Sequence, residues 1–433
     1  MSEKAEKTDS NHSEQKNDTS MPELTAETRK IVVENTAKLL KENYIFPEIA
    51  EKMAEYIQEN LNKGYNIADV PEFCRIMTAD LQGVSQDLHL HVYYNPEEAA
   101  DIIKQEQQDT DEDQSQWWKQ VAMDNYGITK IEYLTGNIGY IDIRYFAPVS
   151  LGGETVVAAM NFLANSDAVI FDVRQNGGGD QYMVQLVESY LFGDKPKHLL
   201  TLYERPKDRD RQIWTLPHVP GNRLPDIPVY VLTSGYTFSG GEDFSYTLKH
   251  HKRAVIVGEP TGGGAHGIDL KVIHGGFVIS LPTERPIHPV TKSNWEGTGV
   301  EPDIAVPRED ALKTAHIHAL ESLIKKMKVP SEVRRLEWEL ERAKAIYACL
   351  KIDEGLLSRY VGQYGKWIVT LKNGALTMSS EKREYGWKLI PMTETLFIVD
   401  ELYTARFITE KGGLALVFLH RDSDREIKIP RIE

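Results

Sequence analysis

The sequence predicts an α/β core between a helical N-terminal region and a β-rich C-terminal domain. The core is predicted by a repeated order of elements, because an apolar strand, a turn and an amphipathic helix follow one another at residues 168–191 and again at 229–251. Apolar residues recur at helical spacing in residues 24–81, whereas residues 357–433 contain short apolar runs separated by turn residues. With 433 residues and 41% hydrophobic side chains, the chain can bury more than one core.

The N-terminal part divides into a tail and a helical region. Residues 1–21 contain no aromatic and almost no aliphatic side chain, so burial cannot offset the entropy of ordering and we expect a disordered tail. Residues 22–95 are expected to form a small helical bundle that ends in a strand carrying histidine. In this strand Leu88 and Leu90 alternate with polar residues, which is typical of a strand with one buried face.

The other boundaries follow changes of composition and periodicity. Residues 96–135 are rich in acidic residues and glutamine and are expected to be a solvated connector. Residues 136–310 contain the α/β core, and residues 311–352 read as a helical linker. Residues 353–433 contain short strands with Asn-Gly and Gly-Gly turns between them, which predicts an antiparallel meander or a lipocalin-like half-barrel.

Composition excludes several classes of function. A formal net charge of −15 argues against nucleic acid as a main partner, because phosphate backbones require basic patches. No apolar run approaches the roughly 20 residues of a membrane span. Cys74 and Cys349 lie far apart and suit a reduced compartment, and no cysteine and histidine cluster has zinc-ligand spacing, so neither a metal nor another cofactor is expected. No signal peptide is visible; we expect a cytoplasmic protein, although an exported protein without its leader would read the same.

Ser239 is the leading candidate nucleophile. It lies between the apolar run 229–232 and the helix predicted from Gly240, so the turn lifts its hydroxyl toward solvent. N–H groups at the start of a helix have no intrahelical acceptor and can bind an oxyanion. The alternative is that Ser239 is only a helix N-cap. Glu242 and Asp243 in the first turn are explained by the positive end of the helix dipole.

A second turn of the same kind follows the strand predicted at residues 168–174. It contains Asn176 and then three glycines, Gly177 to Gly179, which allow positive φ and a close approach of the backbone to a ligand. A plain tight turn is the alternative. A phosphate-binding loop is not expected, because the Lys-Ser/Thr pair of a P-loop and the glycine spacing of a dinucleotide fingerprint are absent.

Together these segments resemble the C-terminal processing (tail-specific) serine peptidases, in the branch of the tricorn protease core and the interphotoreceptor retinoid-binding protein repeats. The matching pieces occur in family order: FDVRQNGGG at residues 171–179, the segment at 237–267 that contains FSGGEDF and EPTGGGAHG, and NWEGTGVEPDI at 294–304. The resemblance implies a crotonase-like core with Ser239 as nucleophile. It also implies that the N–H groups of Gly179 and Gly240 form the oxyanion hole.

The sequence departs from the tail-specific branch in two ways. That branch has a lysine base in the glycine loop after the nucleophile's helix, and the aligned residue here is Gly264, so a serine–lysine dyad is not expected. Many relatives also insert a PDZ domain between the N-terminal helices and the core. The gap from Pro96 to Gly136 is too short for such a domain of ~80 to 100 residues, which places the chain in a branch without one.

The tricorn-like branch uses histidine as base with a distant glutamate, and the resemblance assigns these positions to His89 and Glu296. A neutral imidazole suits the role, because its unperturbed pKa of about 6.5 leaves it an acceptor at physiological pH. The tricorn pattern has a serine directly before the histidine, where this chain has Leu88. The orienting group is therefore left open between Ser85 and Asp87. Two other histidines, His91 and His266, remain rival bases.

These observations predict a serine endopeptidase or oligopeptidase that cleaves peptides or unfolded proteins. Two alternatives use the same fold: a non-catalytic binding module for apolar ligands or peptides, and a serine esterase. Amide and ester substrates need the same nucleophile and oxyanion geometry, so the sequence does not separate them. It also leaves a homo-oligomer open.

Overall fold

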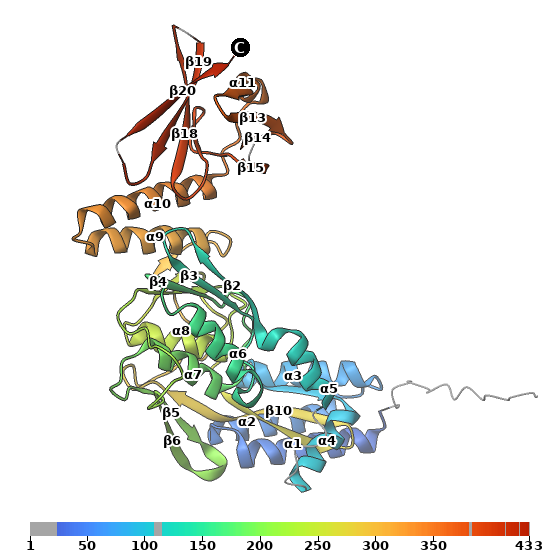
Figure 1. Cartoon of the computed structure of the whole chain (residues 1–433). Coiled ribbons are helices and arrows are strands. Elements are labelled where there is room, and N and C mark those ends of the chain that lie inside the picture. Colours follow the sequence, from blue (N-terminus) through green and yellow to red (C-terminus); the bar gives the residue numbers. More distant parts are fainter. Residues whose placement is uncertain (1–23, 108–114, 381–382, 412, 424, 433) are drawn as a thin grey trace, which may run out of the picture. The chain divides into compact units, whose positions relative to one another are not determined.

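The computed structural model describes residues 24–107, 115–380, 383–411, 413–423 and 425–432 (Figure 1). The tail predicted at residues 1–21 lies outside these ranges. The chain divides into two compact units: residues 1–110 with 268–283, and residues 111–267 with 284–433. Among the described residues, no helix is both long enough and apolar enough to cross a membrane.

The first unit is mainly helical. The helices at residues 26–43 and 70–85 begin at capping side chains: Thr25 Oγ1 accepts the Thr28 N–H at 3.1 Å, and Asp69 Oδ1 accepts the Glu72 N–H at 2.8 Å. A small antiparallel sheet packs against the helices, in which residues 277–280 of β10 pair with β1 and β9 also pairs with β10. The elements are α1 (Ala26–Asn43), α2 (Pro47–Lys63), α3 (Val70–Ser85), β1 (His91–Tyr94), α4 (Pro96–Gln107), β9 (Gly267–His274) and β10 (Phe277–Ile287).

The strand predicted around His89 is shorter than the alternating pattern suggested. Helix α3 ends at Ser85, and β1 begins only at His91, so His89 lies in the turn between them. Asp87 causes this turn, because its Oδ1 accepts the His89 N–H at 3.0 Å and its carbonyl accepts the Leu90 N–H at 3.3 Å. Leu88 is consequently 46% exposed instead of sharing the buried face of Leu90.

The second unit is built on a six-stranded sheet with the order β11-β8-β7-β4-β3-β2. Pairing is parallel from β3 to β11, and β2 is an antiparallel edge strand. Because side chains alternate along each strand, Phe171 and Val231 face one apolar cluster, while Ile170 and Tyr230 face another. The strands are β2 (Ile128–Leu134), β3 (Ile138–Ile143), β4 (Ala168–Asp172), β7 (Val229–Thr233), β8 (Val255–Gly258) and β11 (Ile304–Ala305).

Helices cover both faces of this sheet. The first cluster contains residues of α6 (Val149–Phe162), α7 (Gln181–Leu191) and α8 (Gly240–His250). The second contains residues of α9 (Ala311–Lys326) and α10 (Pro330–Ala348). The unit also contains helix α5 (Ser115–Met123), the 3₁₀ turns η1 (Asn125–Gly127) and η2 (Arg205–Lys207), and the strands β5 (His198–Glu204) and β6 (Arg209–Trp214), which pair with each other.

The C-terminal part of this unit is an antiparallel sheet with the strand order β15-β14-β13-β12-β20-β19-β18-β17-β16. The elements are α11 (Glu354–Tyr360), β12 (Gly362–Tyr364), β13 (Trp367–Lys372), β14 (Ala375–Ser380), β15 (Arg383–Lys388), β16 (Ile390–Pro391), β17 (Leu396–Ile398), β18 (Tyr403–Glu410), β19 (Gly413–His420) and β20 (Glu426–Ile432). The structure therefore confirms the prediction of a mixed α/β fold with a helical N-terminal region and a C-terminal antiparallel sheet.

Candidate active site

Two turns at the carboxyl edge of the central sheet lie against each other. Strands β4 and β7 are parallel neighbours, so the glycine turn after β4 and the serine turn after β7 emerge side by side. A Cβ atom placed on Gly178 would lie 2.7 Å from the Cβ of Ser239, and one on Gly240 would lie 3.2 Å from the Gly179 nitrogen. A side chain on Gly178 would force the two turns apart, and one on Gly240 would be tightly crowded, so glycine at these positions brings Ser239, Gly179 and Gly240 together.

Ser239 has a backbone conformation that an ordinary N-cap does not require. It is the residue before α8, but its φ is 51° and its ψ is −117°, whereas cap residues normally lie in the β region. A non-glycine residue in such a region costs on the order of 1–3 kcal/mol, and such residues cluster at active sites. Capping therefore does not account for the geometry of this half-buried serine.

Two backbone N–H groups beside Ser239 are available to a ligand. Hydrogen bonds fix the glycine turn on either side of Gly179, because Phe146 N–H donates to Gly178 O at 2.8 Å and Asp180 N–H donates to Phe146 O at 2.7 Å. Among the described residues, neither the Gly179 N–H nor the Gly240 N–H has an acceptor. Paired N–H donors next to a hydroxyl are the arrangement that stabilises the oxyanion of a tetrahedral intermediate.

Asn176 ties the two turns together. Its Oδ1 accepts the Gly178 N–H at 2.8 Å, its Nδ2 donates to Ile143 O at 3.1 Å, and its carbonyl accepts the Phe238 N–H at 3.0 Å. The side chain is fully buried. The residue that precedes the three glycines thus fixes both the glycine turn and Phe238, the residue before Ser239.

Glu242 is more than the dipole-stabilising acid that its position in the first turn of α8 suggests. Its carboxylate is fully buried and accepts four hydrogen bonds: from Ser239 N–H at 2.9 Å, from Gly263 N–H at 2.7 Å, from Gly264 N–H at 2.8 Å and from the Thr261 hydroxyl. Burial raises the pKa of Glu242 to about 7, against the lowering effect of these hydrogen bonds. The contacts join the turn at Ser239 to the glycine loop at residues 261–264.

Two other predicted residues meet here: His266 belongs to the glycine loop, and Glu296 belongs to the loop at residues 294–300. Glu296 Oε2 accepts the Ala265 N–H at 2.6 Å and lies 3.4 Å from Nδ1 of His266, which is 3% exposed. The buried Trp295 holds the two loops in register, because its Nε1–H donates to Gly264 O at 2.8 Å. Gly264, which aligns with the lysine of the tail-specific branch, contributes only backbone groups here.

The remaining predicted residues belong to the first unit. Asp87 is 1% exposed; its Oδ2 accepts the Tyr44 hydroxyl proton at 3.3 Å, and its N–H donates to Ser85 Oγ at 3.1 Å. The His89 carbonyl accepts the Ser280 hydroxyl proton at 2.8 Å, which fixes the backbone of that turn. His91 is exposed at the start of β1, opposite Ser280.

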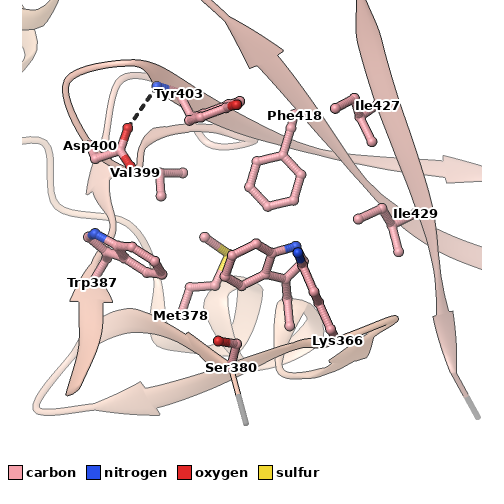
Figure 2. Close-up of a pocket in the computed structure, with 11 residues that line it drawn as sticks. Lys366, Met378, Ser380, Trp387, Val399, Asp400, Tyr403, Phe418, Ile427 and Ile429 are labelled. Carbon is pink, nitrogen blue, oxygen red and sulfur yellow. Dashed lines mark hydrogen bonds between the residues drawn. The ribbon is translucent and has the colours of Figure 1, made fainter. Parts of the chain in front are cut away.

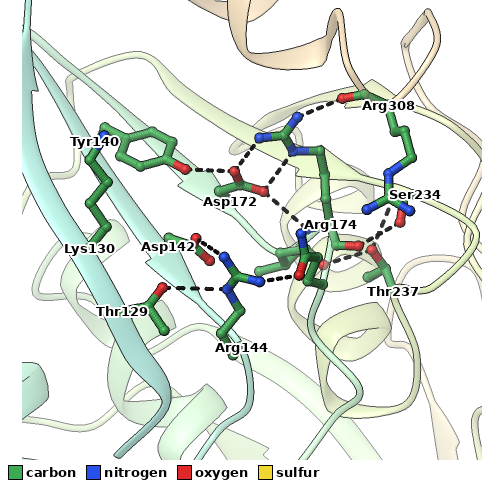
Figure 3. Close-up of polar contacts among 12 residues, drawn as sticks. Thr129, Lys130, Tyr140, Asp142, Arg144, Asp172, Arg174, Ser234, Thr237 and Arg308 are labelled. Carbon is green, nitrogen blue, oxygen red and sulfur yellow. Dashed lines mark hydrogen bonds and ion pairs between the residues drawn. The ribbon is translucent and has the colours of Figure 1, made fainter. Parts of the chain in front are cut away.

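Sequence reasoning missed an ion pair that fixes the end of β4 (Figure 3). Arg174 Nε donates to Asp172 Oδ1 at 2.9 Å, and the Tyr140 hydroxyl donates to Asp172 Oδ2 at 2.7 Å. Burial alone would raise the pKa of Asp172, but the Arg174 guanidinium and the Tyr140 hydroxyl outweigh it and lower that pKa. Arg174 NH1 also donates to Arg308 O at 2.6 Å. An Asp-x-Arg triplet directly before the glycine turn was the available signal.

Comparisons with known proteins agree with the motifs. Residues 137–306 match the model of peptidase family S41, and residues 16–125 match that of the N-terminal domain of peptidase S41 in eukaryotic IRBP. Tricorn protease of Thermoplasma volcanium is 28% identical over 176 residues, which cover 40% of this chain and 16% of that protein. Carboxyl-terminal-processing peptidase 1, chloroplastic, of Arabidopsis thaliana is 27% identical over 196 residues, which cover 44% of this chain and 38% of that protein.

The chain thus spans less than half the length of these curated relatives. Two solved structures are also similar to it. The photosystem II D1 C-terminal processing protease has a TM-score of 0.44 at 12% identity, covering 65% of this chain and 94% of that one. The tricorn protease has a TM-score of 0.43 at 17% identity, covering 69% of this chain and 37% of that one. The matches to the family and to the two relatives confirm the resemblance found from the motifs.

The contacts of Glu242 lead to a stability prediction. In Glu242→Gln, the amide NH₂ group faces N–H donors that it cannot satisfy, so the free energy of unfolding should fall by about 1–3 kcal/mol. Chemical denaturation measures this, with the exposed Glu309→Gln as a matched control that should leave stability unchanged. Equal stability of Glu242→Gln and the wild type would show that the four contacts do not hold the nucleophile turn.

Proposed function

We propose that this chain, which belongs to peptidase family S41, is a serine peptidase. In this proposal Ser239 is the nucleophile that hydrolyses peptide bonds in peptides or unfolded proteins. The observation that carries the proposal is the conformation of Ser239, with its φ of 51°, beside two N–H groups that lack acceptors among the described residues. A turn of this kind presents a hydroxyl and an oxyanion site to the same carbonyl group. We propose that the α/β core that contains Ser239 is crotonase-like.

The reaction follows the two-step scheme of serine hydrolases. The Ser239 hydroxyl attacks the scissile carbonyl, its proton passes to a histidine, and the N–H groups of Gly179 and Gly240 donate to the oxyanion. The same histidine then protonates the leaving amine, which leaves an acyl group on Ser239 Oγ. Water hydrolyses this ester with the histidine again as base, so the serine is regenerated.

His89 is proposed as the base, with Glu296 supporting the polar network. The motif resemblance favours His89, and Asp87 or Ser85 would orient its turn through the backbone contacts described above. The rival base is His266, because its Nδ1 lies 3.4 Å from Glu296 Oε2 in the glycine loop. Glu296 can hold an imidazole in one tautomer, as carboxylates do in catalytic triads.

Peptide profiling tests the nucleophile. A diverse peptide mixture is incubated with the wild type and with Ser239→Ala, and the fragments are read by mass spectrometry. The variant should keep its fold and lose turnover by at least about 10⁴-fold, because the residual catalysis of such sites is small. Turnover retained by a clean preparation of Ser239→Ala would refute the assignment, and ester hydrolysis by the wild type without any peptide fragment would replace the peptidase by an esterase.

The pH dependence identifies the base. For a histidine base, kcat/KM of the wild type should fall as the pH decreases through about 6.5, where the imidazole becomes protonated. His89→Ala should lower kcat by about 10²- to 10⁴-fold and abolish this limb of the profile. The exposed His274→Ala on β9 is the matched control and should behave as the wild type. Loss of the limb in His266→Ala but not in His89→Ala would transfer the role to His266.

A further inference from the structure

The C-terminal β domain contains a cavity of about 610 Å³ (Figure 2). This size is within the range of roughly 300–1,000 Å³ that is typical of sites for small molecules. The domain lies outside both segments that match the peptidase family, so the proposed hydrolysis does not account for it. Its lining includes Lys366, Trp367, Met378, Trp387, Asp400 and Phe418.

The cavity arises from the curvature of the sheet. Its two edge strands, β15 and β16, lie at opposite ends of the strand order but are separated in sequence only by Leu389, so the sheet must curl until these edges meet. One part of the interior is filled by aromatic side chains, with Tyr360 stacked on Phe407 at 4.3 Å between ring centroids and Phe397 beside them. The space on the side of Trp367 and Phe418 is left unfilled.

Most residues of the cavity wall are apolar or aromatic. Met378 of β14 is fully buried and stands opposite Trp387 of β15 in the strand register. The ring of Trp367 meets those of Trp387 and Phe418 at centroid distances of 5.8 and 5.7 Å. In Figure 2 the side chains of Phe418, Met378 and Trp387 point toward the same space. Such a wall suits a hydrocarbon or aromatic body.

Among the described residues, Lys366 and Asp400 are the two charged residues that line the cavity. Backbone donors hold the carboxylate of Asp400, because its Oδ1 accepts the N–H groups of Leu402 and Tyr403, both at 2.9 Å. Lys366 is exposed, and its Nζ lies 5.0 Å from the centroid of the Trp367 ring. Within the described part of the chain, Lys366 has no ion-pair partner, so its ammonium group is available to an anion at the mouth.

We propose that this cavity is a binding site for a small amphipathic carboxylate of the fatty-acid type, with its chain against Met378 and the tryptophans and its carboxylate at Lys366. The aromatic wall provides the apolar surface, and the charge complementarity at Lys366 sets the orientation. The site is separate from Ser239 in the sequence and in its residues, so ligand binding does not depend on whether the protein is a peptidase.

The test is calorimetric titration of the full chain with octanoate, decanoate and dodecanoate, and with decanol as the uncharged probe. Affinity should rise by about fourfold for each added methylene until the cavity is full, since each buried methylene adds a similar increment. One molecule should bind per chain. Absence of saturable binding of any of these probes would overturn the proposal.

Two variants locate the site. Met378→Trp fills the cavity and should weaken decanoate by at least about tenfold, whereas Ile368→Trp places the same side chain on the other face of β13 and should not. Circular dichroism in the aromatic region checks that both variants fold. If both bind decanoate as tightly as the wild type, the ligand is bound elsewhere and the proposal fails.

Lys366→Gln provides a test that does not depend on the packing of the core, because the side chain is exposed. It should weaken decanoate by about threefold to fivefold, the range of an exposed ion pair, and leave decanol unchanged. The exposed Lys372→Gln at the end of β13 is the matched control. Equal effects of Lys366→Gln on decanoate and decanol, or no effect on either, would contradict the proposed orientation.

Discussion

The constraint on which the candidate site depends is the positive φ of Ser239. That conformation is costly, and the surrounding hydrogen bonds must outweigh its cost. Glu242 supplies the central one, because its buried carboxylate accepts the Ser239 N–H together with three donors from the loop at residues 261–264. The turn at Ser239 and the glycine loop are therefore held by one side chain, and a change in either one alters the donors around Glu242.

The second constraint is the adjacency of β4 and β7. Parallel neighbours deliver their carboxyl ends to one edge, and there the missing side chains of Gly178 and Gly240 allow the two turns to touch. The Asp172–Arg174 pair fixes the end of β4, and Asn176 joins its turn to Phe238. The N–H groups that we propose to bind an oxyanion are thus held in place before a substrate arrives, which is how preorganised sites lower a barrier.

Much of the candidate site was predictable from the sequence, because the elements that carry it are close neighbours along the chain. A strand, a turn and a helix follow one another within a few residues, so the sequence alone places Ser239, Gly179 and Gly240 in turns. The role of Glu242 could not be predicted, since an acidic residue in the first turn of a helix looks the same whether it faces solvent or accepts hydrogen bonds from a loop some twenty residues later.

At His89 the alternating pattern predicted the wrong local structure, because Asp87 forms a turn that periodicity does not reveal. The β domain was predictable from its strands, but its cavity depends on how far the sheet curls.

The most direct measurement of the central claim is covalent labelling with a fluorophosphonate, followed by peptide mapping. An activated serine beside an oxyanion site displaces fluoride through its Oγ, whereas an ordinary N-cap serine does not. We expect one adduct per chain, on Ser239, that is lost in Ser239→Ala and in the unfolded wild type. A native protein that stays unlabelled, or that is labelled only at another residue, would contradict the assignment of Ser239 as the nucleophile.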